Sequence, residues 1–181
     1  MLTARQLHAR ATEANASGRF RQARRLFLLA LDRTSDPSLT AALNRGLGYA
    51  QTELGDAREG LSLLTRTITG AEALSEQELG MLLSQRGLIR IRLGDPKGAL
   101  SDYQLAEPML RDEPAELARI GINRGNIFLD QAIVESAIVD FTMAAQQYRL
   151  LGNTIGEAKA IGNLGYAYML AGDLVRALRL I

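Results

Sequence analysis

The stretch Gly165-Tyr-Ala-Tyr-Met-Leu-Ala-Gly172-Asp-Leu-Val-Arg-Ala177 contains a glycine with one small residue seven positions before it and another five positions after it. The same spacing occurs five times along the chain, and such a fixed internal frame is the signature of a repeat architecture. The central position holds Gly18, Gly55, Gly94, Ala132 and Gly172. The small residues before it are Ala11, Gly48, Gly87, Gly125 and Gly165, and those after it are Ala23, Gly60, Ala99, Ala137 and Ala177.

Each copy of this frame predicts two antiparallel helices joined by a tight turn. Glycine adopts the left-handed backbone conformation that ends a helix without steric cost, and an Asp after it can cap the next helix. Four residues beyond the second small position stands a bulky residue, which would pack beside the small residues where the two helices approach closely. These bulky residues are Phe27, Leu64, Tyr103, Phe141 and Ile181.

The helices are therefore predicted over residues 3–16, 19–34, 38–54, 56–72, 75–93, 95–110, 114–130, 134–150, 154–171 and from 173 onward. Ser75 with Glu78 and Thr154 with Glu157 have the spacing of capping boxes, and Pro108 should kink or end its helix. No segment alternates with period two over a useful length, so the expected fold class is all-α.

Composition excludes several classes of function. The 181 residues carry a net charge of +1, no cysteine and a single histidine. Disulfides and thiolate metal sites are therefore excluded, and no basic excess indicates nucleic acid. The longest apolar run, residues 26–31, is too short to span a bilayer, and the first ten residues lack the apolar centre of a secretory signal. We expect a cytoplasmic protein with no cofactor, no metal, no nucleic-acid partner and no membrane partner.

The sequence offers no catalytic constellation. His8 has no motif that supplies a nucleophile or carboxylate partner, and Glu76, Glu78 and Glu157 are typical of helix starts. We therefore expect no enzyme, although a hydrolase with a pocket of convergent titratable groups is the alternative from another class. The cluster Arg21, Arg24 and Arg25 is most simply a solvated helix face, with an anionic partner as the alternative.

The frame resembles the tetratricopeptide repeat (TPR), whose pattern of Leu-Gly, Tyr and later Ala-x3-Phe is matched by Leu164-Gly165-x2-Tyr168 and by Ala137-x3-Phe141. The units are 37 to 40 residues long rather than 34. The leucine that directly precedes the first small residue in the TPR pattern is replaced by Arg10, Arg86 and Arg124. The stretched units are also similar to arrays that precede a caspase-like (CHAT) peptidase domain in actinobacterial proteins, and to arrays in bacterial transcriptional regulators. Any such peptidase domain would lie outside this chain.

The resemblance implies an α-solenoid of five helix hairpins whose first helices line a concave groove. We expect one domain of units 3–36, 37–73, 74–111, 112–151 and 152–181, acting as a non-enzymatic scaffold or regulatory arm that docks a protein or peptide with apolar and acidic residues. A peptide-sensing module of a transcriptional regulator is the nearest alternative. The groove residues carried over from the family are Arg5, His8, Thr12, Arg45, Tyr49, Ser84, Leu88, Arg119, Asn126, Lys159 and Tyr166.

The C-terminal end is apolar. Leu174, Val175 and Leu178 follow the last turn, and few polar residues stand among them. A solenoid end normally needs a polar outer face. The sequence therefore predicts either the N-terminal portion of a longer protein or self-association through this end.

Overall fold

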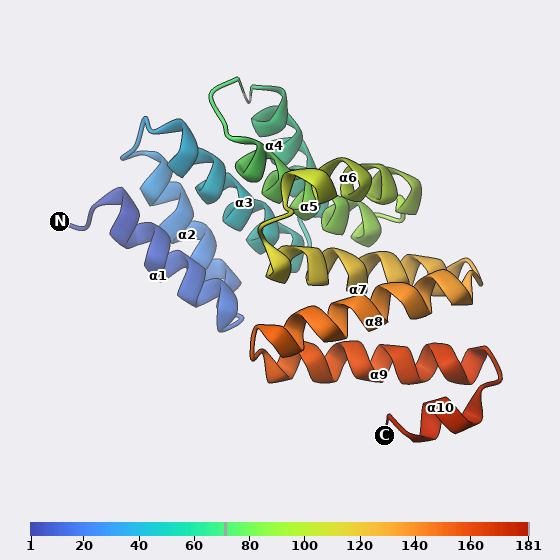
Figure 1. The fold of residues 1–181 in the computed structure, drawn as a ribbon. Helices are drawn as coiled ribbons and strands as arrows, with labels where there is room; N and C mark the ends of the chain where they lie inside the picture. Colours follow the sequence, from blue (N-terminus) through green and yellow to red (C-terminus); the bar gives the residue numbers. More distant parts are fainter. Residues whose placement is uncertain (71, 181) are drawn as a thin grey trace. The chain divides into compact units, whose positions relative to one another are not determined.

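A computed structural model describes residues 1–70 and 72–180, and all of its regular structure within these ranges is helical (Figure 1). The described helices are α1 (Ala4–Ala16), α2 (Phe20–Leu31), α3 (Pro37–Glu53), α4 (Ala57–Thr69), α5 (Glu76–Arg92), α6 (Pro96–Met109), α7 (Pro114–Asp130), α8 (Val134–Leu150), α9 (Thr154–Leu170) and α10 (Leu174–Leu178). The expected all-α fold class is confirmed, and α7 and α8 have the bounds that the repeat frame predicts.

The turns of the hairpins have the backbone conformation that the frame requires. Gly18, Gly55, Gly94 and Gly172 have φ values of 70°, 94°, 77° and 77°. Ala132, at the same position of the fourth hairpin, has φ 57° and is the one non-glycine with positive φ among the described residues. The turn geometry therefore persists where the glycine is replaced.

Some of the helix caps predicted from the sequence are present in the structure and one is not. Ser75 and Glu78 form the predicted capping box at α5, and Thr3 forms another with Gln6 at α1. The capping box expected from Thr154 is wrong, because α9 is capped by the Asn153 side chain, which accepts a hydrogen bond from the Gly156 N–H. Pro108 lies in the last turn of α6, which ends one residue later, so its expected terminating effect is confirmed.

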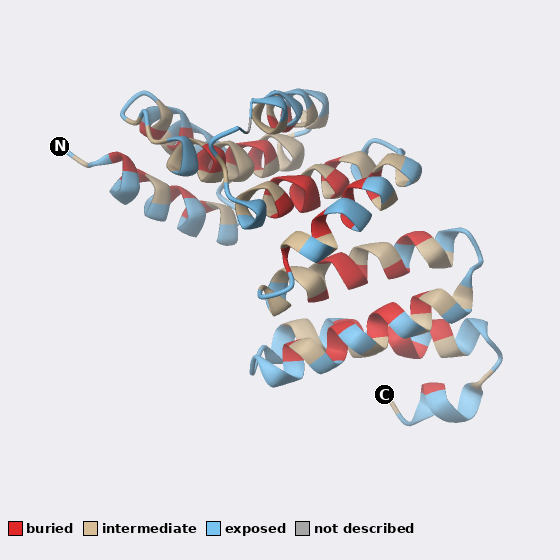
Figure 2. Ribbon diagram, turned by 45° about the horizontal axis from the view of Figure 1, so that its top comes forward, coloured by how far each residue is buried: buried red, intermediate tan, exposed pale blue. Residues whose placement is uncertain are grey.

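The chain divides into two compact units, residues 1–109 and 110–181. In the first unit α1 packs on α2, α3 on α4 and α5 on α6, and the first helices α1, α3 and α5 are neighbours in that order. In the second unit α7 packs on α8, α8 on α9, and α9 on α10. Buried residues lie along the sides of the helices that meet one another (Figure 2).

Small and large residues meet inside the hairpins as predicted. A Cβ added at Gly87 would lie 2.7 Å from the Tyr103 ring, and one added at Gly125 would lie 2.5 Å from the Phe141 ring. Both rings are fully buried. These two glycines are therefore needed for the close approach of α5 to α6 and of α7 to α8. The bulky residue of the fifth hairpin, Ile181, lies outside the described residues.

Candidate functional site

In the first unit, the predicted groove residues of α1 and α3 come together around His8 and Arg45. The His8 ring is half-buried and its centre lies 6.2 Å from that of Phe27. Burial and the nearby positive charge of Arg45 lower the pKa of His8 below its usual 6.5. The imidazole is therefore mostly neutral at pH 7 and offers a hydrogen-bonding group rather than a cation.

A small hollow lies between α3 and α5, with a volume of about 90 Å³. Arg45 and Ser38 of α3 line it together with Glu78 and Met81 of α5. The Ser38 hydroxyl donates a hydrogen bond to the Glu78 carboxylate. This bond, together with the hydrogen bonds that the Ser75 backbone N–H and hydroxyl donate to the same carboxylate, lowers the pKa of Glu78. Its volume is that of about three waters, which suits the tip of one side chain rather than a whole substrate.

Glu78 is a site residue that sequence reasoning missed. Its spacing from Ser75 correctly identified it as part of a capping box, but the expected groove set contained no carboxylate. The Ser38–Glu78 contact spans two hairpins, and nothing in the local sequence indicates that pairing. The hollow between α3 and α5 is therefore lined by side chains of both signs of charge, Arg45 and Glu78.

The other predicted groove residues of this unit differ in their accessibility. Arg5 is 79% exposed in its side chain and pairs with Asp36 at 3.4 Å, and the Tyr49 ring contacts Phe20 edge-on at 5.8 Å. Thr12 is exposed and Leu88 is half-buried. Ser84 is only 2% exposed, so its side chain is not presented on the surface as the frame had suggested.

In the second unit the predicted residues lie on α7 and α9. Arg119 forms an ion pair with Glu116, one turn before it on α7. The Asn163 amide donates to the Asn126 side chain at 3.2 Å, which ties α9 to α7. Lys159 is exposed, and Tyr166 is 51% exposed. Asn163 was not among the predicted groove residues, although it contacts one of them, Asn126. The only sequence signal for it is that it stands next to a position that the repeat frame assigns to the groove.

Within the described part of the chain, no group of three His, Asp or Glu side chains lies close enough to hold a metal ion. No helix in residues 1–70 and 72–180 has the length and apolar content needed to cross a bilayer. Within each unit the first helices carry polar, cationic and apolar side chains, and Arg5, Thr12, Lys159 and Tyr166 are exposed among them.

Two of the three arginines that stand at the leucine position of the repeat pattern, Arg86 and Arg124, form ion pairs with buried aspartates. Arg86 binds both carboxylate oxygens of Asp102, at 3.0 and 2.7 Å, and Arg124 binds both of Asp140, at 2.8 and 2.7 Å. Arg90 adds a second ion pair to Asp102 at 3.1 Å. The two aspartates have 1% and 5% exposed side chains. These departures from the family pattern are therefore structural features of the third and fourth hairpins.

No family model and no curated protein matches this sequence. Solved structures do match. BtubC (BKLC) from P. vanneervenii has a TM-score of 0.81 at 20% identity, over 98% of this chain and 76% of that one. A putative kinesin light chain from Podosopora anserina with TPR-like repeats gives 0.71 at 15% identity, over 97% and 90%. YrrB, described as a TPR protein with an unusual peptide-binding site, gives 0.57 at 18% identity, over 97% and 81%. The chain therefore has the tetratricopeptide-repeat fold that its sequence frame resembles.

Proposed function

We propose that this chain is a non-enzymatic protein-interaction scaffold that docks a partner segment on the faces formed by its first helices. The observation that carries the proposal is the α3–α5 hollow, where Arg45, Ser38 and Glu78 stand beside Met81 and Leu82 on an open surface. Polar groups of both signs around a small apolar depression suit a peptide that places one apolar side chain in it. YrrB, a protein of the same fold, is described as binding a peptide.

The proposed partner is a protein or peptide with apolar anchors and acidic residues. Arg45 and Arg119 would contact its carboxylates, and Tyr49 and Tyr166 would contact its apolar groups, because Arg and Tyr are enriched among binding hot spots. A cytoplasmic scaffold that works as the regulatory arm of a longer protein, such as one with a CHAT peptidase domain, is consistent with this role. A peptide sensor would differ in becoming more compact when its ligand binds.

The test is selection of peptides from a random displayed library on the purified chain, followed by affinity measurement on variants. We expect the selected peptides to be enriched in acidic and apolar residues. Arg45→Glu should weaken their binding at least tenfold, because it reverses the charge beside the hollow. Ser62→Glu, at an exposed position of α4, is the matched control and should leave the affinity unchanged. Equal affinity for the wild type and Arg45→Glu would place binding elsewhere.

Self-association through the C-terminal end is a second candidate, and the exposure of that end favours it. Leu174, Val175 and Leu178 of α10 are 59%, 63% and 73% exposed, and Leu170 of α9 is 49% exposed. An apolar surface of this kind is commonly covered by another protein surface. We propose a second copy of this chain as the cover.

Light scattering across a concentration series tests this contact. The wild type should shift from monomer toward dimer as its concentration rises, and Leu174→Glu/Leu178→Glu should remain monomeric. The control is Val139→Glu/Met143→Glu on α8, where the two side chains are 57% and 54% exposed. A wild type that stays monomeric at all concentrations would exclude self-association without affecting the groove proposal.

A further inference from the structure

The first hairpin holds a strong local excess of positive charge. Residues 1–34 contain seven arginines and only two acidic residues, Glu13 and Asp32. The whole chain has a net charge of only +1, so the remainder is acidic on balance. An excess of this size on one hairpin is large enough to attract an anionic partner.

Most of the arginines of this hairpin are already engaged. Arg5 pairs with Asp36, and Arg19 pairs with Glu13. On α2 itself, Arg24 binds the Asp56 carboxylate at 3.3 Å. An arginine that already has a carboxylate partner gains less from a second one. The charge that remains for a partner must therefore come from other residues.

Arg21 and Arg25 on α2 are such residues. Both are exposed, and within residues 1–70 and 72–180 neither forms an ion pair or a side-chain hydrogen bond. They are four residues apart, so they lie one above the other on the same side of the helix. Leu29, one further turn along and 42% exposed, continues this line with the 46% exposed Leu28 beside it.

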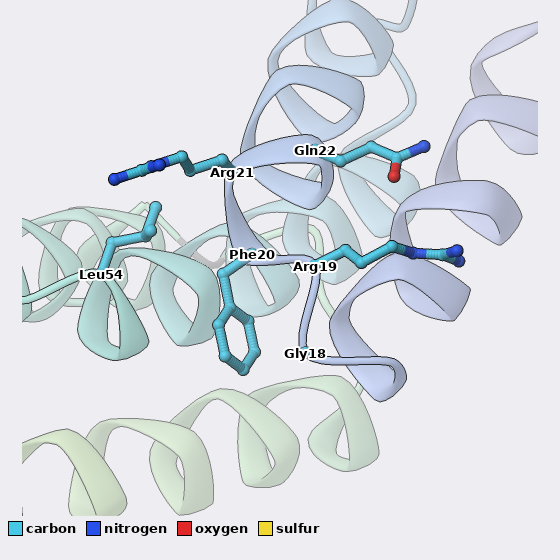
Figure 3. A pocket seen from close by; sticks show the side chains of 6 residues that line it. All are labelled: Gly18, Arg19, Phe20, Arg21, Gln22 and Leu54. Carbon is cyan, nitrogen blue, oxygen red and sulfur yellow. The ribbon is translucent and has the colours of Figure 1, made fainter.

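The start of α2 borders a shallow hollow of about 430 Å³, which Phe20, Arg21 and Leu54 help to line. Arg21 extends toward the side on which Leu54 lies, whereas Arg19 and Gln22 point the opposite way (Figure 3). Phe20 is half-buried against Tyr49, which holds its ring at the edge of the hollow. The volume is enough for a large apolar side chain.

We propose that these residues form a second docking surface, the α2 surface (Phe20, Arg21, Arg25, Leu29 and Leu54), which binds an acidic segment of a partner protein. An apolar side chain of the segment would enter the hollow beside Phe20 and Leu54. Two carboxylates would reach Arg21 and Arg25, which are about 6 Å apart along the helix axis. Four of its five residues belong to α2, a second helix, so it is distinct from the first-helix face of the proposed function.

The chemistry of the α2 surface favours a peptide over a phosphate-rich partner. Two free arginines are few for a polyanion, whose binding usually depends on many cationic contacts. The leucines and the Phe20–Leu54 hollow would be left uncovered by a nucleic acid or by lipid headgroups. A segment that alternates carboxylates with apolar side chains uses both parts of the surface.

The experiment uses the whole chain and a fluorescent 12-residue peptide with four glutamates around a Leu-Phe pair. Two peptide controls replace the glutamates by glutamine or the Leu-Phe pair by alanines. We expect the parent peptide to bind, and each control peptide to bind at least tenfold more weakly. Arg21→Glu/Arg25→Glu should weaken the parent peptide at least tenfold, and Leu54→Gln should weaken it several-fold.

Two further variants separate the α2 surface from general charge and from the groove. Arg58→Glu/Arg66→Glu makes the same change of charge on α4 and should leave the affinity within twofold. Arg45→Glu changes the first-helix face and should weaken the peptide less than Arg21→Glu/Arg25→Glu does. Equal loss in the α2 and α4 variants would reduce the effect to net charge and overturn the proposal. Loss in Arg45→Glu alone would assign the peptide to the groove and also overturn it. Anionic vesicles that bind through Arg21 and Arg25 when the peptide does not would identify a membrane as the occupant instead. Circular dichroism and melting temperature should confirm that every variant is folded.

Discussion

Arg124 and Asp140, sixteen residues apart on α7 and α8, form a bidentate ion pair that is largely buried beside the Gly125–Phe141 contact. Arg86 and Asp102 repeat the arrangement in the preceding hairpin. At the corresponding positions the second hairpin holds Leu47 and Leu63 and the fifth holds Leu164 and Leu180, and each leucine pair belongs to one apolar cluster. The same place between two helices therefore accepts either a charged pair or an apolar pair.

This equivalence predicts how substitutions of the ion pair behave. Arg124→Leu leaves the Asp140 carboxylate buried without its guanidinium partner, so the free energy of unfolding should fall by about 3–5 kcal/mol. Arg124→Leu/Asp140→Leu recreates the pairing of the fifth hairpin and should recover most of this loss. Urea denaturation of both single variants and the double variant measures the coupling. A double variant no more stable than Arg124→Leu would contradict the equivalence.

The close approach of α5 to α6 makes a second prediction. Gly87→Leu forces a side chain against the buried Tyr103 ring and should cost about 1–3 kcal/mol through overpacking. The removal of a mid-helix glycine returns about 1 kcal/mol of helix propensity, so the net effect should be destabilising.

Gly162 on α9 is the matched control for that substitution, because an added Cβ there meets no atom within 4 Å. Gly162→Ala should raise the free energy of unfolding by roughly 0.5–1 kcal/mol through helix propensity alone. Thermal and urea denaturation of the two variants should give effects of opposite sign. A rise in stability for Gly87→Leu would show that Gly87 does not limit the helix approach.

The helices and turns could be predicted because their causes are local. Turn glycines, the Ser75–Glu78 box and the small-to-large spacing all act within one hairpin, whose internal spacing is constant. From the sequence, Arg86 and Arg124 were identified only as departures from the leucine of the repeat pattern. Their partners Asp102 and Asp140 lie on the second helix of the same hairpin, so the pairs can be identified only once the packing of the two helices is known.

Contacts between different hairpins could not be predicted from the sequence. The Ser38–Glu78 bond joins α3 to α5, and the Arg5–Asp36 pair joins α1 to the residue that caps α3. In both cases a connection of variable length separates the two partners. This variation leaves the register of neighbouring first helices undetermined. For the same reason the frame placed Ser84 on the groove face, although its side chain is buried.

A buried amide gives a third prediction. Gln85 on α5 is 4% exposed, and its Nε2 has no hydrogen-bond partner. A buried donor left without a partner costs about 1–3 kcal/mol, so Gln85→Met, which keeps the length of the side chain, should raise the free energy of unfolding by about 1 kcal/mol. Gln104→Met, at an exposed position of α6, is the control and should change it little. Destabilisation by Gln85→Met would show that the amide makes a bond the protein needs.

The last prediction concerns pH and the single histidine. Because burial and Arg45 lower the pKa of His8 in the folded protein, the unfolded chain binds more protons than the folded one as the pH falls through the unfolded value of about 6.5. The free energy of unfolding should therefore decrease with falling pH across this window and level off, as far as His8 is concerned, below the folded pKa. His8→Gln should remove this part of the slope. Since the chain has only one histidine, its ring proton resonance titrates without overlap in an NMR experiment. We expect an apparent pKa below 6.5 in the wild type and a higher value in Arg45→Gln, where the repelling charge is absent. A wild-type pKa at or above 6.5 would mean that the His8 ring is open to solvent and that α1 does not hold it beside Arg45.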